Sequence, residues 1–134
     1  MGTTDADRAL ESFYRRYLQL CNEHQFERLG EFVDEDVTVN GETQGLQAYV
    51  EGLQLVVAAF PDYRWDLKHM FVHRDWVSAH FTDTGTHLGE FLGVPGTGRA
   101  ISTQEFAVYR IDAAKIIEVW VAADNPPAEP AAVS

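Results

Sequence analysis

The chain has 134 residues, 46% of them hydrophobic, which is enough for one domain with a packed core but not for two. Its formal net charge is −11, because 21 acidic residues outnumber ten scattered lysines and arginines. Proteins that bind nucleic acid or anionic membranes present basic patches, so we expect no nucleic-acid partner and no membrane partner. The single cysteine excludes an internal disulfide and a cysteine-rich zinc site.

The first half of the sequence predicts helices. Thr4 is a candidate N-cap, and it is followed by acids, which helix N-termini favour. Apolar residues then recur at helical spacing as far as Cys21. A short helix is expected at about 26–32, and "DVTVNG" predicts a short strand that ends in a turn. A third helix is expected to follow Gly45 and to end at Pro61.

The second half changes to the two-residue period of strands. The segments "YRWDLKHMFVHR" and "DWVSAHFTDTGTH" predict two strands joined by a tight turn at residues 74–75. In the first of them, alternation places four side chains on one face: Trp65, Leu67, His69 and Phe71. After a glycine-rich loop, "AISTQEFAVYRI" and "KIIEVWVAAD" predict a hairpin connected by "DAA".

Helices followed by antiparallel strands indicate an α+β domain. A curved sheet with the helices packed on its concave face would enclose a pocket. We expect this domain to span residues 1–125. Residues 126–134 are rich in proline and alanine and have no periodicity, so we expect a disordered tail there.

Several segments resemble the SnoaL-like polyketide cyclases of the nuclear-transport-factor-2-like superfamily. They are "CNEHQFERLGEFV", "FPDYRWDL", "GTHLGEFLGVPGTGR" and "YRIDAAKIIEVW", together with an aspartate four residues after the tryptophan. The resemblance covers about residues 14–125 and implies a cone-shaped barrel with a mixed, mostly antiparallel sheet. The sequence departs from the family at Gln25 (commonly aspartate), at Gly96 (usually proline) and at Ala114 (usually glycine).

The last hairpin predicts which side chains share a face. With a three-residue turn at 112–114, residue 111 would pair with 115 and Trp120 would lie opposite Phe106. One face would carry Ser102, Gln104, Phe106, Glu118, Trp120 and Asp124. The other would carry Ile101, Thr103, Ala107, Tyr109, Ile117, Val119 and Val121. The polar and aromatic face is typical of a ligand pocket, and the aliphatic face would suit a partner subunit in a homodimer or homotetramer.

The resemblance implies that Asp124 is the catalytic general acid and base, although an aspartate before Asn and Pro is also a common turn former. In an apolar pocket the pKa of such a carboxyl is raised, which suits proton transfer near neutral pH. We expect five side chains to bind the substrate: Gln104, Trp120, Phe106, His69 and His80. The alternatives for Gln104 and the two histidines are core or surface packing. The five histidines of the sequence form no ligand pattern, so we expect no metal site.

These features predict a cofactor-independent cyclase that acts on a polyketide-like small molecule by intramolecular aldol addition. Two alternatives remain open: an epoxide-opening or pericyclic cyclase on the same scaffold, or a non-catalytic module for small-molecule binding or dimerisation. The first 13 residues lack the basic and apolar segments of a secretory signal, and we expect a cytoplasmic protein.

Overall fold

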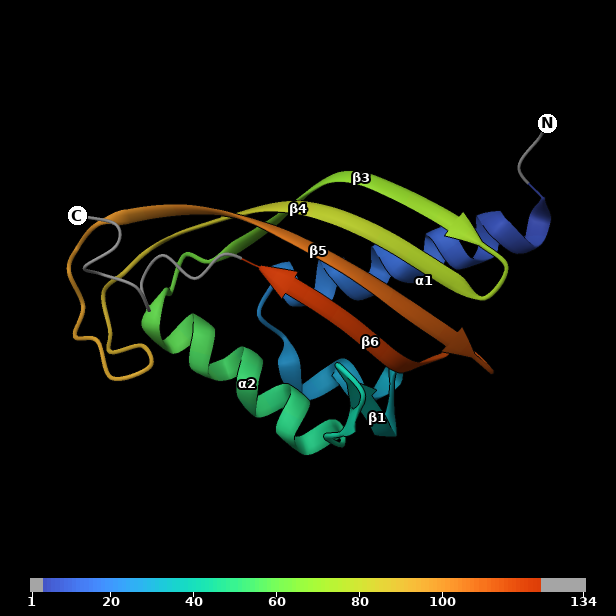
Figure 1. Cartoon of the computed structure of the whole chain (residues 1–134), viewed down its shortest axis with the longest axis horizontal. Helices are drawn as coiled ribbons and strands as arrows, with labels where there is room; N and C mark the ends of the chain where they lie inside the picture. Colours follow the sequence, from blue (N-terminus) through green and yellow to red (C-terminus); the bar gives the residue numbers. More distant parts are fainter. Residues whose placement is uncertain (1–3, 124–134) are drawn as a thin grey trace.

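The computed structural model describes residues 4–123 (Figure 1). Its helices are α1 (Asp5–Asn22), the 3₁₀ helix η1 (Phe26–Glu31) and α2 (Leu46–Ala59). Its strands are β1 (Val33–Val39), β2 (Glu42–Thr43), β3 (Arg64–His73), β4 (Trp76–Thr86), β5 (Ala100–Asp112) and β6 (Lys115–Ala123). The order of elements confirms the α+β prediction, and Asp124 and the expected tail lie outside the described residues.

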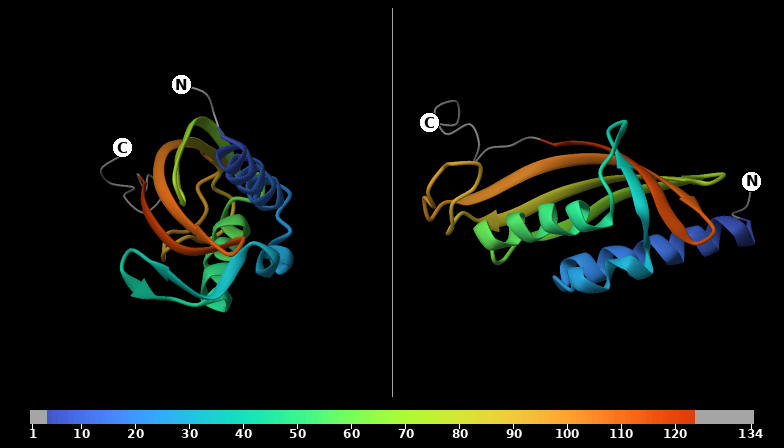
Figure 2. Two further views of the ribbon diagram at one scale, coloured as in Figure 1. Left: turned by 90° about the vertical axis from the view of Figure 1, so that its right-hand side faces the viewer. Right: turned by 90° about the horizontal axis from the view of Figure 1, so that it is seen from below.

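The six strands form one mixed sheet in the order β2-β1-β6-β5-β4-β3. All neighbours are antiparallel except β1 and β6, which are parallel. The sheet curves around the helices, which lie on its concave face (Figure 2). It does not close into a barrel, because β2 and β3 remain edges, so the expected cone is open.

Local sequence explains where the helices begin and end. The Thr4 hydroxyl accepts a hydrogen bond from the Asp7 backbone N–H, and the Asp7 carboxylate accepts one from the Thr4 N–H. This reciprocal pair satisfies two of the free N–H groups at the start of α1. α2 follows Gly45 and ends two residues before Pro61, as the sequence predicts.

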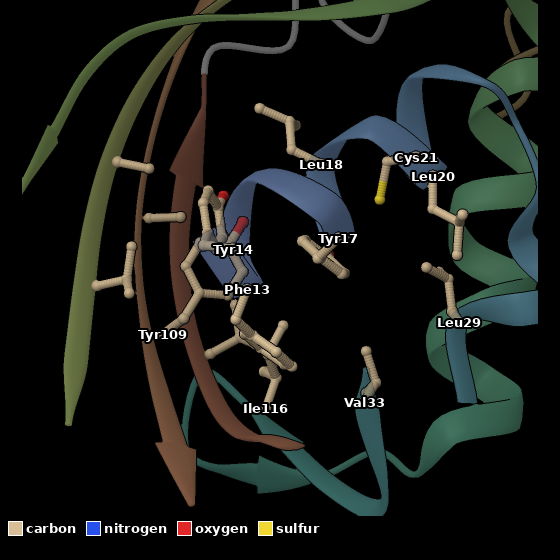
Figure 3. Packing of buried hydrophobic residues seen from close by; sticks show 14 of the residues in the cluster. Phe13, Tyr14, Tyr17, Leu18, Leu20, Cys21, Leu29, Val33, Tyr109 and Ile116 are labelled. Atoms are coloured by element: carbon tan, nitrogen blue, oxygen red, sulfur yellow. The ribbon is translucent and has the colours of Figure 1, made fainter. Parts of the chain in front are cut away.

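The core lies between the helices and the concave face of the sheet. α1 contributes a stripe of buried residues that includes Phe13, Tyr14 and Tyr17. From the sheet, Tyr109 and Ile116 reach the same interior, where Figure 3 shows them beside α1. The concave face is therefore the one that carries Ala107, Tyr109 and Val119, which the sequence assigns to a partner subunit. This assignment is wrong, because the chain's own helices cover that face.

The last hairpin turns more tightly than expected. Asp112 pairs with Lys115, so the turn consists of Ala113 and Ala114, both with positive φ. An irregularity between Arg110 and Ile111 then shifts the register by one residue. The shift restores the expected parity, so among the described residues Phe106 still shares a face with Glu118 and Trp120. Their partners differ, since Trp120 lies opposite Val108 instead of Phe106.

A second irregularity, between Leu67 and His69, corrects the predicted face of β3. Trp65 is buried on the concave side, whereas the side chain of Phe71 is 67% exposed on the convex side. Strict alternation failed here because one extra residue reverses the face of every later side chain.

The glycine-rich loop between β4 and β5 packs onto the end of α2. His87 is 1% exposed, and its ring stacks on Phe60 with a centroid distance of 5.1 Å. A Cβ on Gly89 would lie 2.8 Å from the Ala58 carbonyl oxygen, and a Cβ on Gly96 would collide with the Leu88 carbonyl. Glycine is thus required here for close backbone approach, which agrees with a structural interpretation of this loop.

Candidate functional site: an inner cavity and an outer groove

The concave side of the sheet contains a cavity of about 200 Å³, which we call the inner cavity. It is lined by Tyr14, Tyr17, Leu18, Cys21, Val39, Gln44, Tyr49, Gly52, Leu53, Trp65, Phe81, Glu105, Tyr109, Val119 and Val121. None of these described lining residues is Lys, Arg or His. The cavity is therefore aromatic and uncharged except for the group at Glu105.

The convex side of the sheet has an open hollow of about 620 Å³, which we call the outer groove. It brings together four of the five predicted substrate-binding residues: His69, His80, Phe106 and Trp120. The fifth, Gln104, is hydrogen bonded to His80 at its edge. The predicted residues thus do meet, but on the surface opposite the inner cavity and without helices over them.

Hydrogen bonds connect the polar residues of the outer groove. The His80 Nε2 lies 2.7 Å from the Gln104 Oε1, an acceptor, so this nitrogen carries the proton. The His80 Nδ1, 3.0 Å from the His69 Nδ1, then accepts a hydrogen bond from His69 when His80 is neutral. The Gln104 Nε2 donates to the Thr82 hydroxyl at 3.2 Å, and the Phe106 ring stacks on His80 at 4.5 Å. These contacts hold the groove's polar groups in place.

Asp124, the predicted catalytic residue, lies outside the described residues. The residue before it in the sequence, Ala123, ends β6 and pairs with Glu105. The catalytic role of Asp124 therefore stays a prediction from the resemblance.

Two carboxyl groups that the sequence did not single out lie together on the concave side. Asp83 on β4 is 0% exposed and pairs with Trp65 on β3. Glu105 on β5 pairs with Phe81, which places it diagonally across from Asp83 on the same face. Glu105 lines the inner cavity, and Asp83 lies behind it, so only Glu105 faces a ligand there.

The contacts of this pair require a shared proton. The Tyr63 hydroxyl donates to the Asp83 Oδ2 at 3.0 Å. The Asp83 Oδ1 is buried and has no N–H or hydroxyl partner among the described residues. The carboxyl group of Asp83 lies close enough to that of Glu105 for a hydrogen bond between the two side chains. Two carboxylates cannot hydrogen bond to each other unless one is protonated.

Both carboxyls are desolvated, and their hydrogen bonds determine which one keeps the proton. Desolvation, a hydrogen bond to Asp83 and the negative charge of Asp83 raise the pKa of Glu105 to about 9. The Trp65 side chain also hydrogen bonds to Glu105, which opposes the shift. The pKa of Asp83 is raised as well, chiefly by desolvation, but its hydrogen bonds to Glu105 and Tyr63 favour its ionised form. At neutral pH we therefore assign the proton to Glu105.

Hydroxyl groups from both helices surround the same cavity. The Tyr17 and Tyr49 hydroxyls are 2.6 Å apart. The Tyr14 and Tyr109 rings are 4.8 Å apart, and Figure 3 shows these two side chains next to each other. Burial raises the pKa of all four phenols and raises that of the Cys21 thiol to about 12. These groups are neutral near pH 7, so they can hydrogen bond to a ligand but cannot act as bases.

A sequence signal for the pair exists in the strand alternation. In β4 the odd-numbered residues Val77, Ala79 and Phe81 are buried, and Asp83 occupies the next position of that series. An acidic residue at the position where the alternation of a strand predicts a buried side chain indicates a buried carboxyl group. Glu105 likewise has the parity of Ala107 and Tyr109.

Within residues 4–123, no three His, Cys, Asp or Glu side chains converge in a way that could hold a metal ion. No helix among the described residues is long and apolar enough to span a membrane.

The chain was compared with known proteins. The family model described as SnoaL-like polyketide cyclase matches residues 11–131. A SnoaL-like polyketide cyclase from Agrobacterium tumefaciens strain C58 superposes with a TM-score of 0.80 at 30% identity, covering 92% of this chain and 97% of that one.

Two further structures share the fold at lower identity. IdmH from Streptomyces antibioticus has a TM-score of 0.78 at 23% identity, with 90% and 95% of the two chains covered. TsrD from Streptomyces laurentii has a TM-score of 0.81 at 18% identity, with 92% and 93% covered. A search of curated proteins found no match. The match over nearly all of the sequence, together with the open cone and its inner cavity, shows that the chain belongs to the SnoaL-like polyketide cyclase family.

Proposed function

We propose that this protein closes a ring in a small polyketide-like molecule by intramolecular aldol addition in the inner cavity, without a cofactor. The observation that carries the proposal is the inner cavity itself, in which aromatic walls and neutral hydroxyls surround Glu105, the one carboxyl group among the described lining residues. Such a site folds a flexible chain and places a proton-transfer group next to it. Family membership supports the reaction class.

The size and charge of the cavity support a small neutral substrate. Its volume of about 200 Å³ is below the ~300 Å³ at the lower end for drug-sized ligands. No described cationic side chain lines it, so a carboxylate or phosphate on the substrate would have no partner inside. A substrate that forms one ring and bears only ketone, enol or ester groups fits these conditions.

In this proposal Asp124 removes a proton from a carbon between two carbonyl groups. The electron pair forms the new carbon–carbon bond to a third carbonyl carbon, and the resulting alkoxide takes up a proton. The product is an isomer of the substrate, so no oxidant or reductant is consumed. The main contribution of the cavity is to hold the chain in a reactive geometry.

An experiment with a short linear poly-β-ketone tests the proposal. The purified protein should convert it to a cyclic isomer, detected by chromatography and NMR, faster than buffer alone. Dialysis against EDTA should leave the rate unchanged. An epoxide-opening cyclase would instead be inactive on the ketone and active on a hydroxy-epoxide of similar size.

The outer groove favours a second candidate, a module that binds a flat ligand or a second copy of the chain. Its observation is the exposure of apolar side chains on the convex face: Phe71 is 67%, Phe106 57% and Trp120 44% exposed. In this candidate Gln104, His69 and His80 would bind the ligand as predicted from the sequence. We expect a homodimer or homotetramer in the cytoplasm, associated through this convex face.

The tryptophans distinguish the two sites, because Trp65 lines the inner cavity and Trp120 the outer groove. A ligand in the inner cavity should quench fluorescence in wild type and in Trp120→Phe but much less in Trp65→Phe. The opposite pattern would place the ligand in the outer groove and refute the inner site.

A further inference from the structure

We propose that Glu105, positioned by Asp83, is the proton donor of the ring closure, so that two different carboxyl groups remove and deliver the protons. The inference rests on the proposed function and deepens it. Asp124 would act only as the base, whereas the resemblance alone gives one aspartate both tasks. The geometry of the Asp83–Glu105 pair supports this inference: the Glu105 carboxyl lines the inner cavity, and the Asp83 carboxyl is fully buried next to it.

The surroundings of Glu105 explain why it holds a proton. The titratable groups that act on it come from the sheet and from both helices: Asp83 on β4, Tyr63 directly before β3, Tyr109 on its own strand, and Tyr14, Cys21 and Tyr49 on the helices. All of them are neutral or negative, so none stabilises a Glu105 carboxylate by opposite charge. Within residues 4–123, the Trp65 indole is the group that donates a hydrogen bond to its carboxyl.

Asp83 acts through Glu105 and not on the substrate. It is 0% exposed and does not line the inner cavity. One of its oxygens accepts the Tyr63 hydroxyl at 3.0 Å, so the other is left to the Glu105 proton. This contact fixes the orientation of the Glu105 carboxyl and keeps it protonated in a solution at neutral pH. Asp83 is therefore a positioning residue.

The proton transfers balance within one cycle. When the enolate attacks, the carbonyl π electrons move to oxygen, the Glu105 O–H bond breaks, and its proton joins that oxygen. Two adjacent carboxylates then remain in a desolvated place, which is unfavourable. This repulsion favours reprotonation of Glu105. The proton that Asp124 took from carbon returns to Glu105 through water after the product leaves, so the starting state of the pair is restored.

The groups around the cavity provide no better donor. The four tyrosines have pKa values raised by burial, so they are much weaker acids than the Glu105 carboxyl. The Cys21 thiol, with a pKa raised to about 12, is weaker too. Among the described residues that line the cavity, Glu105 has the most acidic proton at neutral pH.

The central test separates proton removal from ring closure. On a 2-alkylated β-ketoester in D₂O, NMR follows deuterium uptake at the carbon between the carbonyls, and on the linear poly-β-ketone chromatography follows the ring. Glu105→Gln should keep deuterium uptake and lose about 10²-fold or more in ring closure. Asp124→Asn should lose both, and Glu51→Gln on the exposed face of α2 is the matched control, with both rates as in wild type.

The failures of the two proposals are distinguishable. No ring closure by wild type on the ketone refutes the proposed function. Ring closure by wild type that persists in Glu105→Gln refutes the present inference alone. Loss of deuterium uptake in Glu105→Gln also overturns it, because Glu105 would then be the base.

The pH dependence of ring closure and of the Glu105 titration tests the role of Asp83. In wild type, ring closure should decline with a midpoint near pH 9, and a ¹³C-carboxyl NMR titration of Glu105 should show the same midpoint without any substrate. Asp83→Asn should lower both midpoints by about 1–3 units, because a negative neighbour is removed. Tyr63→Phe should raise both midpoints, because the doubly ionised pair loses the hydroxyl that donates to Asp83. This variant replaces Asp83→Asn in the test if Asp83→Asn does not fold. Unmoved midpoints in a folded variant would assign Asp83 a merely structural role.

Discussion

Replacing Glu105 by glutamine should flatten the pH dependence of the free energy of unfolding. The pKa of Glu105 is about 9 in the folded chain, because burial and Asp83 disfavour its charge, and about 4.3 in an unfolded chain. Between these values the folded state binds more protons than the unfolded state. The stabilising contribution of Glu105 is thus fully present below about pH 4.3 and is lost as the pH rises towards 9.

The magnitude follows from one proton. Each pH unit inside that window changes the free energy of unfolding by about 1.4 kcal/mol, so the change from pH 5 to pH 8 is on the order of 4 kcal/mol. Glutamine has the shape of a neutral glutamic acid. Its amide can donate to the Asp83 Oδ1 and accept from Trp65, so it retains the contacts of the protonated pair.

Urea unfolding at a series of pH values measures this effect, as the difference between wild type and Glu105→Gln. The two proteins should be similar in stability near pH 5, and the variant should become the more stable one as the pH approaches 9. Glu51→Gln provides the matched control and should follow wild type throughout. Parallel curves for Glu105→Gln and wild type would show that Glu105 is ionised in the folded chain, and the shared-proton description would be wrong.

Three further changes test other parts of the structure. Asp124→Asn should reduce turnover at least about 10²-fold while the melting temperature stays nearly constant, because the asparagine amide can hydrogen bond but cannot act as an acid or a base near neutral pH; retained activity would remove Asp124 from the mechanism. Trp120→Ala should lower the molar mass measured by light scattering and spare ligand binding in the inner cavity, since the side chain is 44% exposed on the convex face. Ala114→Gly should raise the free energy of unfolding by about 1 kcal/mol in urea titrations, because the residue has a φ of 61° in the hairpin turn, and an unchanged midpoint would contradict this reasoning.

Local patterns in the sequence predicted most of the elements. The capping residues at Thr4 and Asp7 and the glycine and proline around α2 act within a few residues of each other, so the sequence reveals them directly. The tight turn at Arg74–Asp75 is confirmed for the same reason, since His73 pairs with Trp76.

The faces of the sheet could not be assigned in this way. Alternation shows which side chains share a face, but the identity of the buried face depends on where the helices pack. The stripe that includes Phe13 and Tyr17 on α1 covers Ala107, Tyr109 and Val119, and this long-range contact leaves the aromatic face exposed. Both faces carry aromatic side chains, so aromatic composition alone does not show which face the helices cover.

The acid pair escaped prediction for a related reason. Asp83 and Glu105 are 22 positions apart in sequence, and their contact depends on the register between β4 and β5. Neither belongs to a short motif. An acid at these positions becomes unusual only when one knows both which residues of the strand share a face and that this face is buried.

The close approach of Gly96 to the Leu88 carbonyl limits how this protein can be engineered. Gly96 is one of the positions at which the sequence departs from the family pattern that it resembles, which has proline there. Substitution toward a family consensus is a common route to higher stability. Here the proline ring would have to occupy space that the Leu88 backbone already fills. The two ends of the loop are held by the pairing of β4 with β5, so the loop has little freedom to move away. Proline in place of Gly96 should therefore destabilise this protein, and the loop should be redesigned together with Leu88.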